Sequence, residues 1–175
     1  NLVFLIDRSG SMQASRKLPL LKQSLKRLIG QLRAIDRLTL ISFADSAILH
    51  YSTRGVTQKD SLYRFIDNFV DVGKTRAIEG LQLAYDYTEQ NIIDEGNNEI
   101  ILVTDGLFSL SAEDRQRIRA NRRIVLSAVG LGKDRKALNT LRKLAERASG
   151  SFIHIRGTNP DTEVLLEEVK ARSRL

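Results

Sequence analysis

The chain has 175 residues, a length typical of one domain that buries about 70% of its unfolded surface in a single core. Hydrophobic residues make up 42% and charged residues 28%, which excludes a disordered or fibrous chain, and the lack of cysteine excludes disulfide scaffolds, thiolate zinc sites and cysteine nucleophiles. The 28 Lys and Arg residues against 21 Asp and Glu give a net charge of +7, which favours acidic partners.

The start of the chain is abrupt. Asn1 leads directly into the apolar run Leu2–Ile6, without an initiator methionine, a basic leader or a cleavage site. No apolar run approaches the roughly 18 residues of a membrane span. We therefore expect residues 1–175 to be one domain, cut from a larger protein whose targeting signals lie elsewhere.

Short apolar strands and amphipathic helices alternate along the first half of the chain. Leu2–Ile6 predicts a buried strand that ends in an acidic turn, Asp7–Ser11. Arg37–Phe43 and Ala47–Tyr51 predict two strands that pair as a hairpin at a sheet edge. Helical spacing connects the following residues: Leu18, Leu21, Leu25, Leu28, Ile29 and Leu32 in one helix; Leu62, Phe65, Ile66 and Phe69 in the next; and Ala77, Leu81, Ala84 and Tyr85 in a third.

The second half repeats the alternation. Glu99–Thr104 predicts a strand that ends, like the first, at an acidic turn, and Ser111 with Asp114 predicts a helix cap. The remaining predictions are a strand over Ile124–Val129 closed by Gly130, a helix from Ala137 to Ala148 ended by Gly150, a strand over Ser151–Ile155 and a closing helix over Thr162–Lys170.

This order predicts an α/β fold: a doubly wound, mostly parallel six-stranded sheet with one antiparallel edge strand and helices on both faces. The strands read as apolar throughout, which burial on both faces requires. Such sheets bind ligands at the carboxyl ends of their strands. Both acidic turns, Asp7–Ser11 and Asp105-Gly106, fall at such ends.

Oxygen-bearing side chains gather in these turns. Asp7, Ser9 and Ser11 stand at alternate positions of one loop, Asp105 ends another strand, and Thr75 follows Gly73 in a loop that opens a helix. Carboxylate and hydroxyl oxygens suit a hard cation such as Mg²⁺ or Ca²⁺. Taken alone, Asp7–Ser11 also fits a polar turn whose serines cap a helix, and the two other segments favour the cation site.

These motifs resemble a known family. Asp-x-Ser-Gly-Ser after the first strand, a loop threonine near the middle and Thr-Asp-Gly after a later strand are the signature of the von Willebrand factor type A domain, which has a Rossmann-like fold and carries a metal-ion-dependent adhesion site. The similarity runs through essentially the whole chain, and Leu2–Met12 with the following helix looks like bacterial members.

The resemblance implies a role for each matching residue. Ser9 and Ser11 would bind the metal through their hydroxyls, and Thr75 would be a third hydroxyl ligand. Asp7 and Asp105 would hold the site with their charges, largely through waters. The metal would be Mg²⁺, with Ca²⁺ or Mn²⁺ as alternatives. Its open position would take a carboxylate from a protein partner, so the implied chemistry is recognition without catalysis or a small-molecule substrate.

The sequence departs from the family pattern in its charges. Lys74 and Arg76 flank Thr75 where small residues are usual, and Arg8 separates Asp7 from Ser9. Two outcomes are open: these cations weaken metal binding by repulsion, or they attract an acidic ligand.

Competing motifs for catalysis or nucleotide binding are incomplete. Gly73-Lys74-Thr75 has the tail of a phosphate-binding loop, but Asn68 stands where its first glycine belongs. A phosphatase that uses Asp7 as acceptor needs a second acid two residues on, where Ser9 stands. His50 and His154 lie far apart in strand-like runs, which does not favour a histidine-based site.

Two clusters of basic residues remain. No aromatic residue is interleaved with them, so they favour solvated helix faces over nucleic acid, with an acidic partner or an anionic membrane surface as the next alternative. One cluster comprises Arg115, Arg117, Arg119, Arg122 and Arg123, and the other Lys133, Arg135, Lys136, Arg142, Lys143 and Arg147.

The leading hypothesis is a non-catalytic, metal-dependent protein-binding or adhesion module in a larger bacterial-type protein. An alternative with the same fold is an accessory subunit of a chelatase or MoxR-like ATPase inside the cell. Nucleic-acid binding through the arginine clusters is a weaker third. The cell envelope or a membrane, reached through flanking regions, is the favoured location, with the cytoplasm as the alternative.

Overall fold

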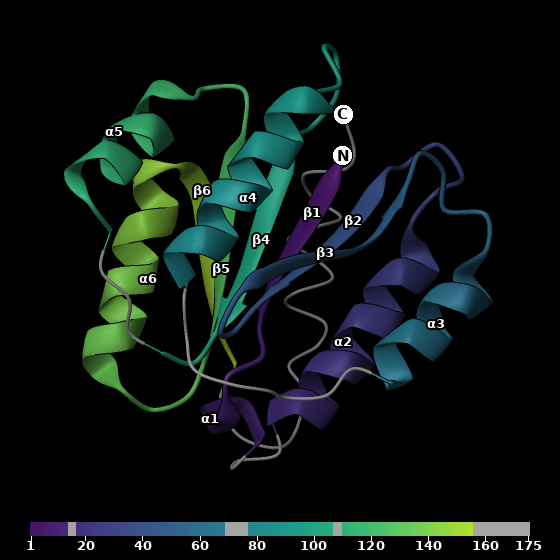
Figure 1. Cartoon of the computed structure of the whole chain (residues 1–175), viewed down its shortest axis with the longest axis horizontal. Coiled ribbons are helices and arrows are strands. Elements are labelled where there is room, and N and C mark those ends of the chain that lie inside the picture. Colours follow the sequence, from purple (N-terminus) through teal and green to yellow (C-terminus); the bar gives the residue numbers. More distant parts are fainter. Residues whose placement is uncertain (14–16, 69–76, 107–109, 156–175) are drawn as a thin grey trace.

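The computed structural model describes residues 1–13, 17–68, 77–106 and 110–155. These residues form a six-stranded sheet with helices on its two faces (Figure 1). The strands are β1 (Leu2–Asp7), β2 (Leu38–Phe43), β3 (Ala47–Thr53), β4 (Glu99–Thr104), β5 (Val125–Leu131) and β6 (Ser149–Ile155). The helices are α1 (Gly10–Gln13), α2 (Lys17–Gln31), α3 (Lys59–Asp67), α4 (Ala77–Gln90), α5 (Ala112–Ala120) and α6 (Arg135–Arg147).

The strand order is β3-β2-β1-β4-β5-β6, which confirms the predicted doubly wound sheet. β1 lies near the middle and pairs in parallel with β2 on one side and β4 on the other, with Ile6 opposite both Ser42 and Val103. Only the β2–β3 pair is antiparallel among the described strands, as the predicted hairpin requires. The order of the strands reverses at β1, so the ends of β1 and β4 flank the position where such sheets bind ligands.

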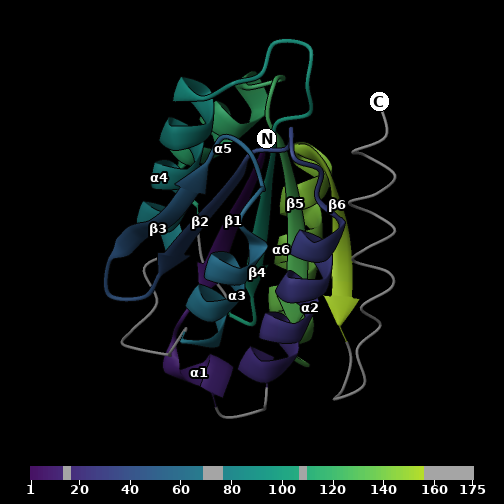
Figure 2. The ribbon, with the colours of Figure 1, turned by 90° about the vertical axis from the view of Figure 1, so that its right-hand side faces the viewer.

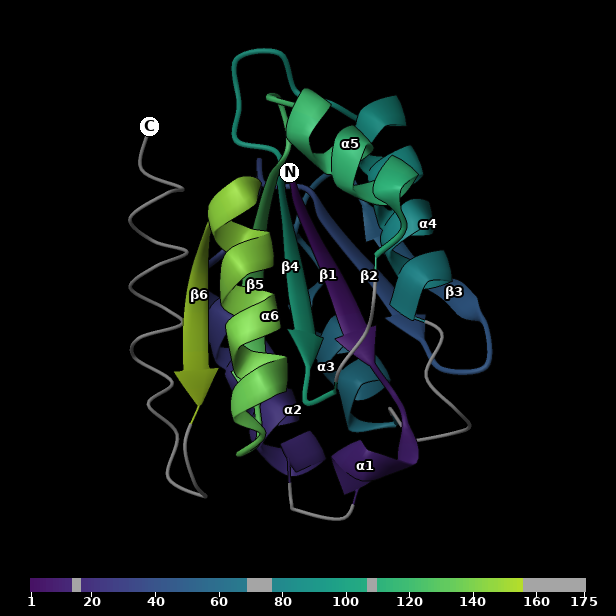
Figure 3. The same cartoon turned by 90° about the vertical axis from the view of Figure 1, so that its left-hand side faces the viewer.

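Helices cover both faces of the sheet, as Figures 2 and 3 show from opposite sides. α2 and α3 pack on one face, where Leu25 and Leu62 join a buried cluster that includes Phe4 of β1. α4, α5 and α6 pack on the other, where the buried cluster includes Leu5 of β1 and Tyr85 of α4. Successive residues of β1 thus enter opposite cores, which explains why its whole run is apolar.

β3 corrects the expectation that all strands are apolar and buried. Its seven residues are half-buried or exposed, whereas every residue of β1, β2 and β4 is buried. The reason is its place at the margin of the sheet, where helices cover it less. The pairing with β2 is also interrupted by a bulge after Leu49, which leaves His50 between the paired residues Leu49 and Tyr51.

The start of α5 follows the predicted cap chemistry, and α6 begins with a side-chain cap that the sequence analysis did not predict. Ser111 caps α5 with a complete capping box: its hydroxyl accepts from the Asp114 N–H, and the Asp114 side chain accepts from the Ser111 N–H. At α6 the Asp134 carboxylate accepts from the N–H groups of Lys136 and Ala137. Side-chain acceptors thus satisfy backbone donors that the first turn leaves unpaired.

Two glycines predicted to end elements lie inside strands instead. α6 ends at Arg147, and Ser149, with φ of 57°, takes the left-handed conformation that makes the turn. Gly150 belongs to β6, where a Cβ would lie 1.9 Å from the carbonyl oxygen of Leu126. Gly130 similarly belongs to β5, where a Cβ would lie 2.6 Å from the side chain of Leu138. Both glycines permit close packing.

The acidic turn after β1 is more ordered than the predicted loop. Gly10–Gln13 forms α1, a single helical turn, and the Met12 N–H donates to the Ser9 carbonyl (2.9 Å). The Met12 side chain is fully buried. In Figure 3, α1 lies beside the ends of β1 and β4, on the side to which the β2–β3 turn also points.

The two histidines lie in strands, as predicted, and make structural contacts. Nε2 of His50 in β3 lies 2.6 Å from the Ser42 hydroxyl, and its ring packs on Phe65. Nε2 of His154 in β6 donates to the Gly132 carbonyl (2.7 Å). None of these three contacts involves the acidic turns.

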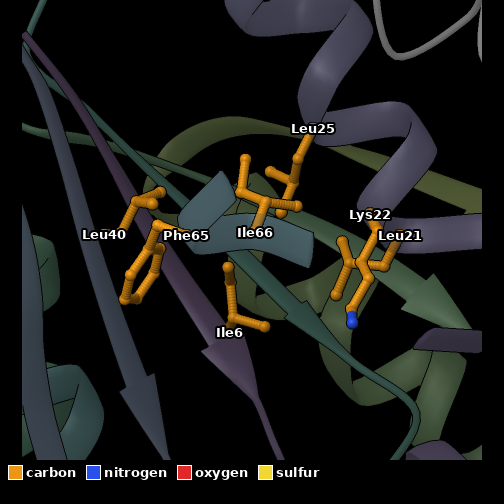
Figure 4. A pocket seen from close by; sticks show the side chains of 7 residues that line it. All are labelled: Ile6, Leu21, Lys22, Leu25, Leu40, Phe65 and Ile66. Carbon is orange, nitrogen blue, oxygen red and sulfur yellow. The ribbon is translucent and has the colours of Figure 1, made fainter. Parts of the chain in front are cut away.

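A small apolar cavity lies between the sheet and α2 and α3 (Figure 4). Its one charged lining group, Lys22, donates through Nζ to the Asp67 carbonyl (2.8 Å). A volume of about 10 Å³ is far below the roughly 300 Å³ of a small-molecule site. The lining residues are Ile6, Leu21, Lys22, Leu25, Leu40, Phe65 and Ile66.

Three predictions fall outside the described residues: the helix over Thr162–Lys170, the position of Phe69 in the second helix, and the threonine loop. None of the described helices is both long and apolar enough to cross a membrane.

Candidate metal centre

The candidate centre lies where β1 and β4 end side by side. Because the two strands are parallel neighbours, Asp7 at the end of β1 and Asp105 just after β4 reach the same edge of the sheet. Ser9 and Ser11 follow on the short connection into α1. Hydrogen bonds from the Arg8 N–H to the Phe43 carbonyl (2.9 Å) and from the Met12 N–H to Ser9 fix this connection at both ends.

A continuous chain of hydrogen bonds joins four of the five predicted site residues. The Ser9 N–H donates to Asp7 Oδ1 (2.8 Å), and the Ser9 and Ser11 hydroxyl oxygens lie 3.1 Å apart. The Ser11 hydroxyl donates to Asp105 Oδ1 (2.8 Å). Three residues at or after the end of β1 and one after β4 thus converge on one place, although 94 positions separate Ser11 from Asp105. Their roles as metal ligands stay a prediction.

Thr104 is a site residue that the sequence analysis missed. Its hydroxyl donates to Asp7 Oδ2 (2.5 Å) and accepts from the Gly106 N–H (3.1 Å). Thr104 is buried at the end of β4, and in the sequence it cannot be told from an ordinary last residue of an apolar strand. The available signal was its position: a polar residue at the end of a strand beside the strand that ends in Asp7.

Asp7 is buried completely. Burial raises the pKa of its carboxyl, while hydrogen bonds from Ser9 and Thr104 act in the opposite direction and the nearby charge of Asp105 raises the pKa further. A buried carboxylate beside a second carboxylate carries uncompensated negative charge, and a cation bound here would compensate it.

The donor set fits a hard divalent cation. Two carboxylates and two hydroxyls offer only oxygen, the ligand that Mg²⁺, Mn²⁺ and Ca²⁺ take in proteins. The described part of the chain holds no cluster of three or more His, Cys, Asp or Glu side chains, so any metal here depends on hydroxyl ligands as well as on Asp7 and Asp105.

The other predicted ligand, Thr75, lies outside the described residues together with Lys74 and Arg76. Their place at the site stays a prediction. Arg8, the third residue that departs from the family pattern, is half-buried. Burial lowers the pKa of His50, and the charge of Arg8 lowers it further.

The arginine clusters divide into structural and solvent-facing residues. Arg117 is structural: it pairs with Asp86 (2.7 Å) and Glu89 (2.7 Å) of α4 and lies over the Tyr85 ring. Arg123 pairs with Asp94. The second cluster, on and just before α6, is exposed, in agreement with the predicted solvated helix face.

Comparisons with known proteins agree with this architecture. The family model of the von Willebrand factor type A domain matches residues 2–108. The uncharacterized protein YfbK of Escherichia coli K12 is 33% identical over 177 residues, which cover 97% of this chain and 31% of YfbK. The chain thus spans about a third of the length of that relative.

Solved structures with lower identity share the fold. BatB from Bacteroides thetaiotaomicron superposes with a TM-score of 0.78 at 19% identity, over 99% of this chain and 98% of BatB. Proximal thread matrix protein 1 from the mussel byssus, solved with a zinc-occupied adhesion motif, has a TM-score of 0.72 at 21% identity, over 97% of this chain and 44% of that protein. Because the family model covers more than half of the chain, the protein belongs to the von Willebrand factor type A domain family, a family of protein-interaction modules.

Proposed function

We propose that this domain is a metal-dependent protein-binding module, with Asp7, Ser9, Ser11 and Asp105 holding a divalent cation. The observation that carries the proposal is the hydrogen-bonded chain that joins these four residues across two strand ends. The zinc-occupied motif in the mussel protein of the same fold supports it. Thr75 is proposed as a further ligand on the family resemblance alone.

The residues of the site have separable roles. Asp7, buried and held at both oxygens by Ser9 and Thr104, supplies a fixed negative charge. Ser11 is exposed and supplies a hydroxyl at the surface, where a partner has access. A divalent cation bound there would supply a positive charge able to attract a partner's carboxylate.

The proposed role is binding without catalysis. The described side chains of the site are aspartates and hydroxyls, and none of them is a histidine that could relay a proton between a nucleophile and a substrate. The alternative of an ATPase accessory subunit concerns regions outside this chain, and it stays a prediction.

Calorimetric titration with Mg²⁺, Mn²⁺, Ca²⁺ and Zn²⁺ tests the proposal. We expect one site per domain in the wild type and no binding by Asp7→Ala. Asp60→Ala is a matched control, because Asp60 is an exposed aspartate in the first turn of α3, remote from the site. Wild-type protein that binds none of the four ions at millimolar concentration would contradict the proposal, and so would an Asp7→Ala variant that binds as well as wild type.

The threonine loop gives a second test. Thr75→Ala removes a neutral ligand and no charge, so metal affinity should fall by about 1–3 kcal/mol while stability changes by about 0.5 kcal/mol or less. Lys74→Ala removes a positive charge and should raise metal affinity if that charge faces the site. Unchanged metal affinity in Thr75→Ala would remove Thr75 from the ligand set.

A further inference from the structure

β3 is the outermost strand of the sheet on the side of β2, so among the described strands one of its edges has no neighbour (Figure 1). An unpaired strand edge presents backbone N–H and C=O groups in the pattern that another extended chain would match. Natural proteins usually protect such an edge with charged side chains or proline. The seven residues Ala47–Thr53 contain neither, and the β-bulge, which is another such protection, begins only after Leu49.

The same strand exposes apolar side chains. Three large hydrophobic side chains are exposed in the described part of the chain: Ile35, Ile48 and Leu49, with exposed fractions of 73%, 44% and 38%. Two of them are neighbours on β3. Because they follow each other along a strand, Ile48 and Leu49 point to opposite faces, and an added strand would meet apolar surface on both sides.

The pairing register connects this edge to the candidate metal centre. Ala47 pairs with Phe43, and Phe43 pairs with Asp7, so the start of β3 lies level with the end of β1. At the usual strand spacing of about 4.8 Å, Ala47 lies two strands, or roughly 10 Å, to the side of Asp7. The stretch Ala47–Leu49 pairs regularly with β2, because the bulge begins only after Leu49.

One basic residue follows the end of β3, and another follows the end of β1. Arg54 follows β3 directly and is exposed, and Arg8 is tied to the end of β2 through its bond to Phe43. One acid, Asp45, lies in the turn between β2 and β3. Together with the net charge of +7, these arginines favour an acidic occupant.

We propose that the partner adds an extended, acidic segment to the sheet along β3 and places a carboxylate of the same segment at the metal centre. This inference rests on the proposed function and specifies the partner as a β-strand-forming peptide with apolar residues at alternate positions. Main-chain pairing to β3 supplies affinity, and Ile48 and Leu49 select the alternating apolar side chains.

The distance sets the spacing within such a segment. An added strand would lie one spacing outside β3, or about 15 Å from β1. At about 3.3 Å per extended residue, the chain needs roughly four or five residues beyond the paired stretch to reach the centre. A segment that pairs antiparallel to β3 reaches the level of Ala47 with its C-terminal end, so the acidic residue follows the apolar stretch.

Nuclear magnetic resonance titration of the whole chain tests this proposal in two steps. The first step adds Mg²⁺ alone, which should shift the amide signals of Ser9, Ser11 and Gly106. The second adds a synthetic peptide of alternating valine and threonine, a glycine-serine spacer of about four residues and a terminal aspartate whose C-terminus is amidated, so that its side chain is the only carboxylate of the peptide. We expect this peptide to shift the amide signals of Ala47–Leu49 as well.

Matched peptides and variants separate the two contacts. A peptide with proline inside the alternating stretch should not shift β3, and a peptide with asparagine for aspartate should lose the dependence on Mg²⁺. The variant Ile48→Thr/Leu49→Thr keeps strand-forming residues and removes the apolar surface, so peptide affinity should fall about tenfold. Ile35→Thr is the matched control, because Ile35 is exposed but precedes β2 at the opposite end of the sheet.

The outcomes distinguish this inference from the proposed function. Mg²⁺ shifts at the centre with no peptide-induced shift in Ala47–Leu49 would overturn the strand addition and leave the metal function standing. No response to any of the divalent ions would overturn the proposed function itself. Concentration-dependent shifts of β3 without peptide would show that a second copy occupies the edge, which also overturns the proposal.

Discussion

Two buried carboxylates in this domain have opposite electrostatic situations. Asp7 at the end of β1 and Asp114 at the start of α5 each accept hydrogen bonds from backbone and side-chain donors. Yet the pKa of Asp7 is raised, chiefly by burial, and the pKa of Asp114 is lowered, chiefly by its hydrogen bond from Gln82. Hydrogen bonds alone therefore do not decide how a buried carboxylate behaves.

The difference lies in what surrounds each group. Asp7 is completely buried and has Asp105 as a neighbour of the same charge. Asp114 is less deeply buried, has Ser111 and Gln82 as donors, and lies within the field of the Arg117 guanidinium. The negative charge of Asp114 is thus already stabilised by these neighbours, and its role is structural. The negative charge of Asp7 stays uncompensated, and a cation-binding site requires such a charge.

The largest expected effect comes from Asp7→Asn. This change removes one charge and keeps the shape, so Mg²⁺ affinity should fall at least about 100-fold, because two opposite charges at contact distance interact by several kcal/mol even at an effective dielectric constant near 20. Without metal, the midpoint of urea unfolding should not fall, since the variant no longer buries a charge. A loss of stability in the metal-free protein would mean that Asp7 is structural, like Asp114.

Removing one donor from each carboxylate compares the two directly. Thr104→Val leaves the Asp7 oxygen in a buried place without its partner and should cost about 1–3 kcal/mol of unfolding free energy. Gln82→Ala removes the donor to Asp114 from an exposed position and should cost less than about 1 kcal/mol. Equal costs, measured by urea unfolding without metal, would contradict the difference in environment.

Asp114→Ala should lower the unfolding free energy by about 1–2 kcal/mol through loss of the capping box, with Mg²⁺ affinity unchanged. Because the pKa of Asp114 is lowered from its ordinary 3.8, its contribution is present above that pH and is lost as the pH falls through the lower folded pKa. The gap between wild type and variant should close in acid. The exposed neighbour Glu113 provides the control variant, Glu113→Ala, and a gap that persists at low pH would contradict the charged cap.

The smallest effect is expected for Ser11→Ala. Ser11 is exposed and neutral, so stability should change by about 0.5 kcal/mol or less. Metal affinity should fall about threefold to tenfold, because one hydroxyl ligand is lost. Ser61→Ala, on the exposed side of α3, serves as the control in the same calorimetric titration. Metal binding by Ser11→Ala that equals the control would show that Ser11 only bridges to Asp105.

The elements of the fold were accessible from sequence because each carries a local signal. The run over β4 is apolar and ends at an acidic turn, and the strand spans Glu99–Thr104 as predicted. The cap at Ser111 is a three-residue pattern that the structure confirms. Gly130 and Gly150 were misplaced because their need for glycine comes from close packing, against the Leu138 side chain and the Leu126 carbonyl respectively, and not from a turn.

The site was accessible only in part, for a related reason. Polar turns after apolar strands are easy to recognise in the sequence, and they contain Asp7, Ser9, Ser11 and Asp105. The family resemblance then assigned both turns to one site. Thr104 was missed because a threonine at a strand end is compatible with simple burial. Its role appears only when the parallel pairing of β1 and β4 brings it to Asp7.

The bond between Thr104 and Asp7 spans 97 positions of the chain, which has a consequence for folding. The two halves of the proposed metal centre come together only when β4 docks beside β1, so the unfolded chain holds no preformed site. Any ion that binds the centre then stabilises the docked sheet by mass action and raises its melting temperature with concentration. Metal binding would therefore distinguish nascent chains that have already added β4 to the sheet from shorter ones, since a chain that stops before β4 lacks half of the proposed site.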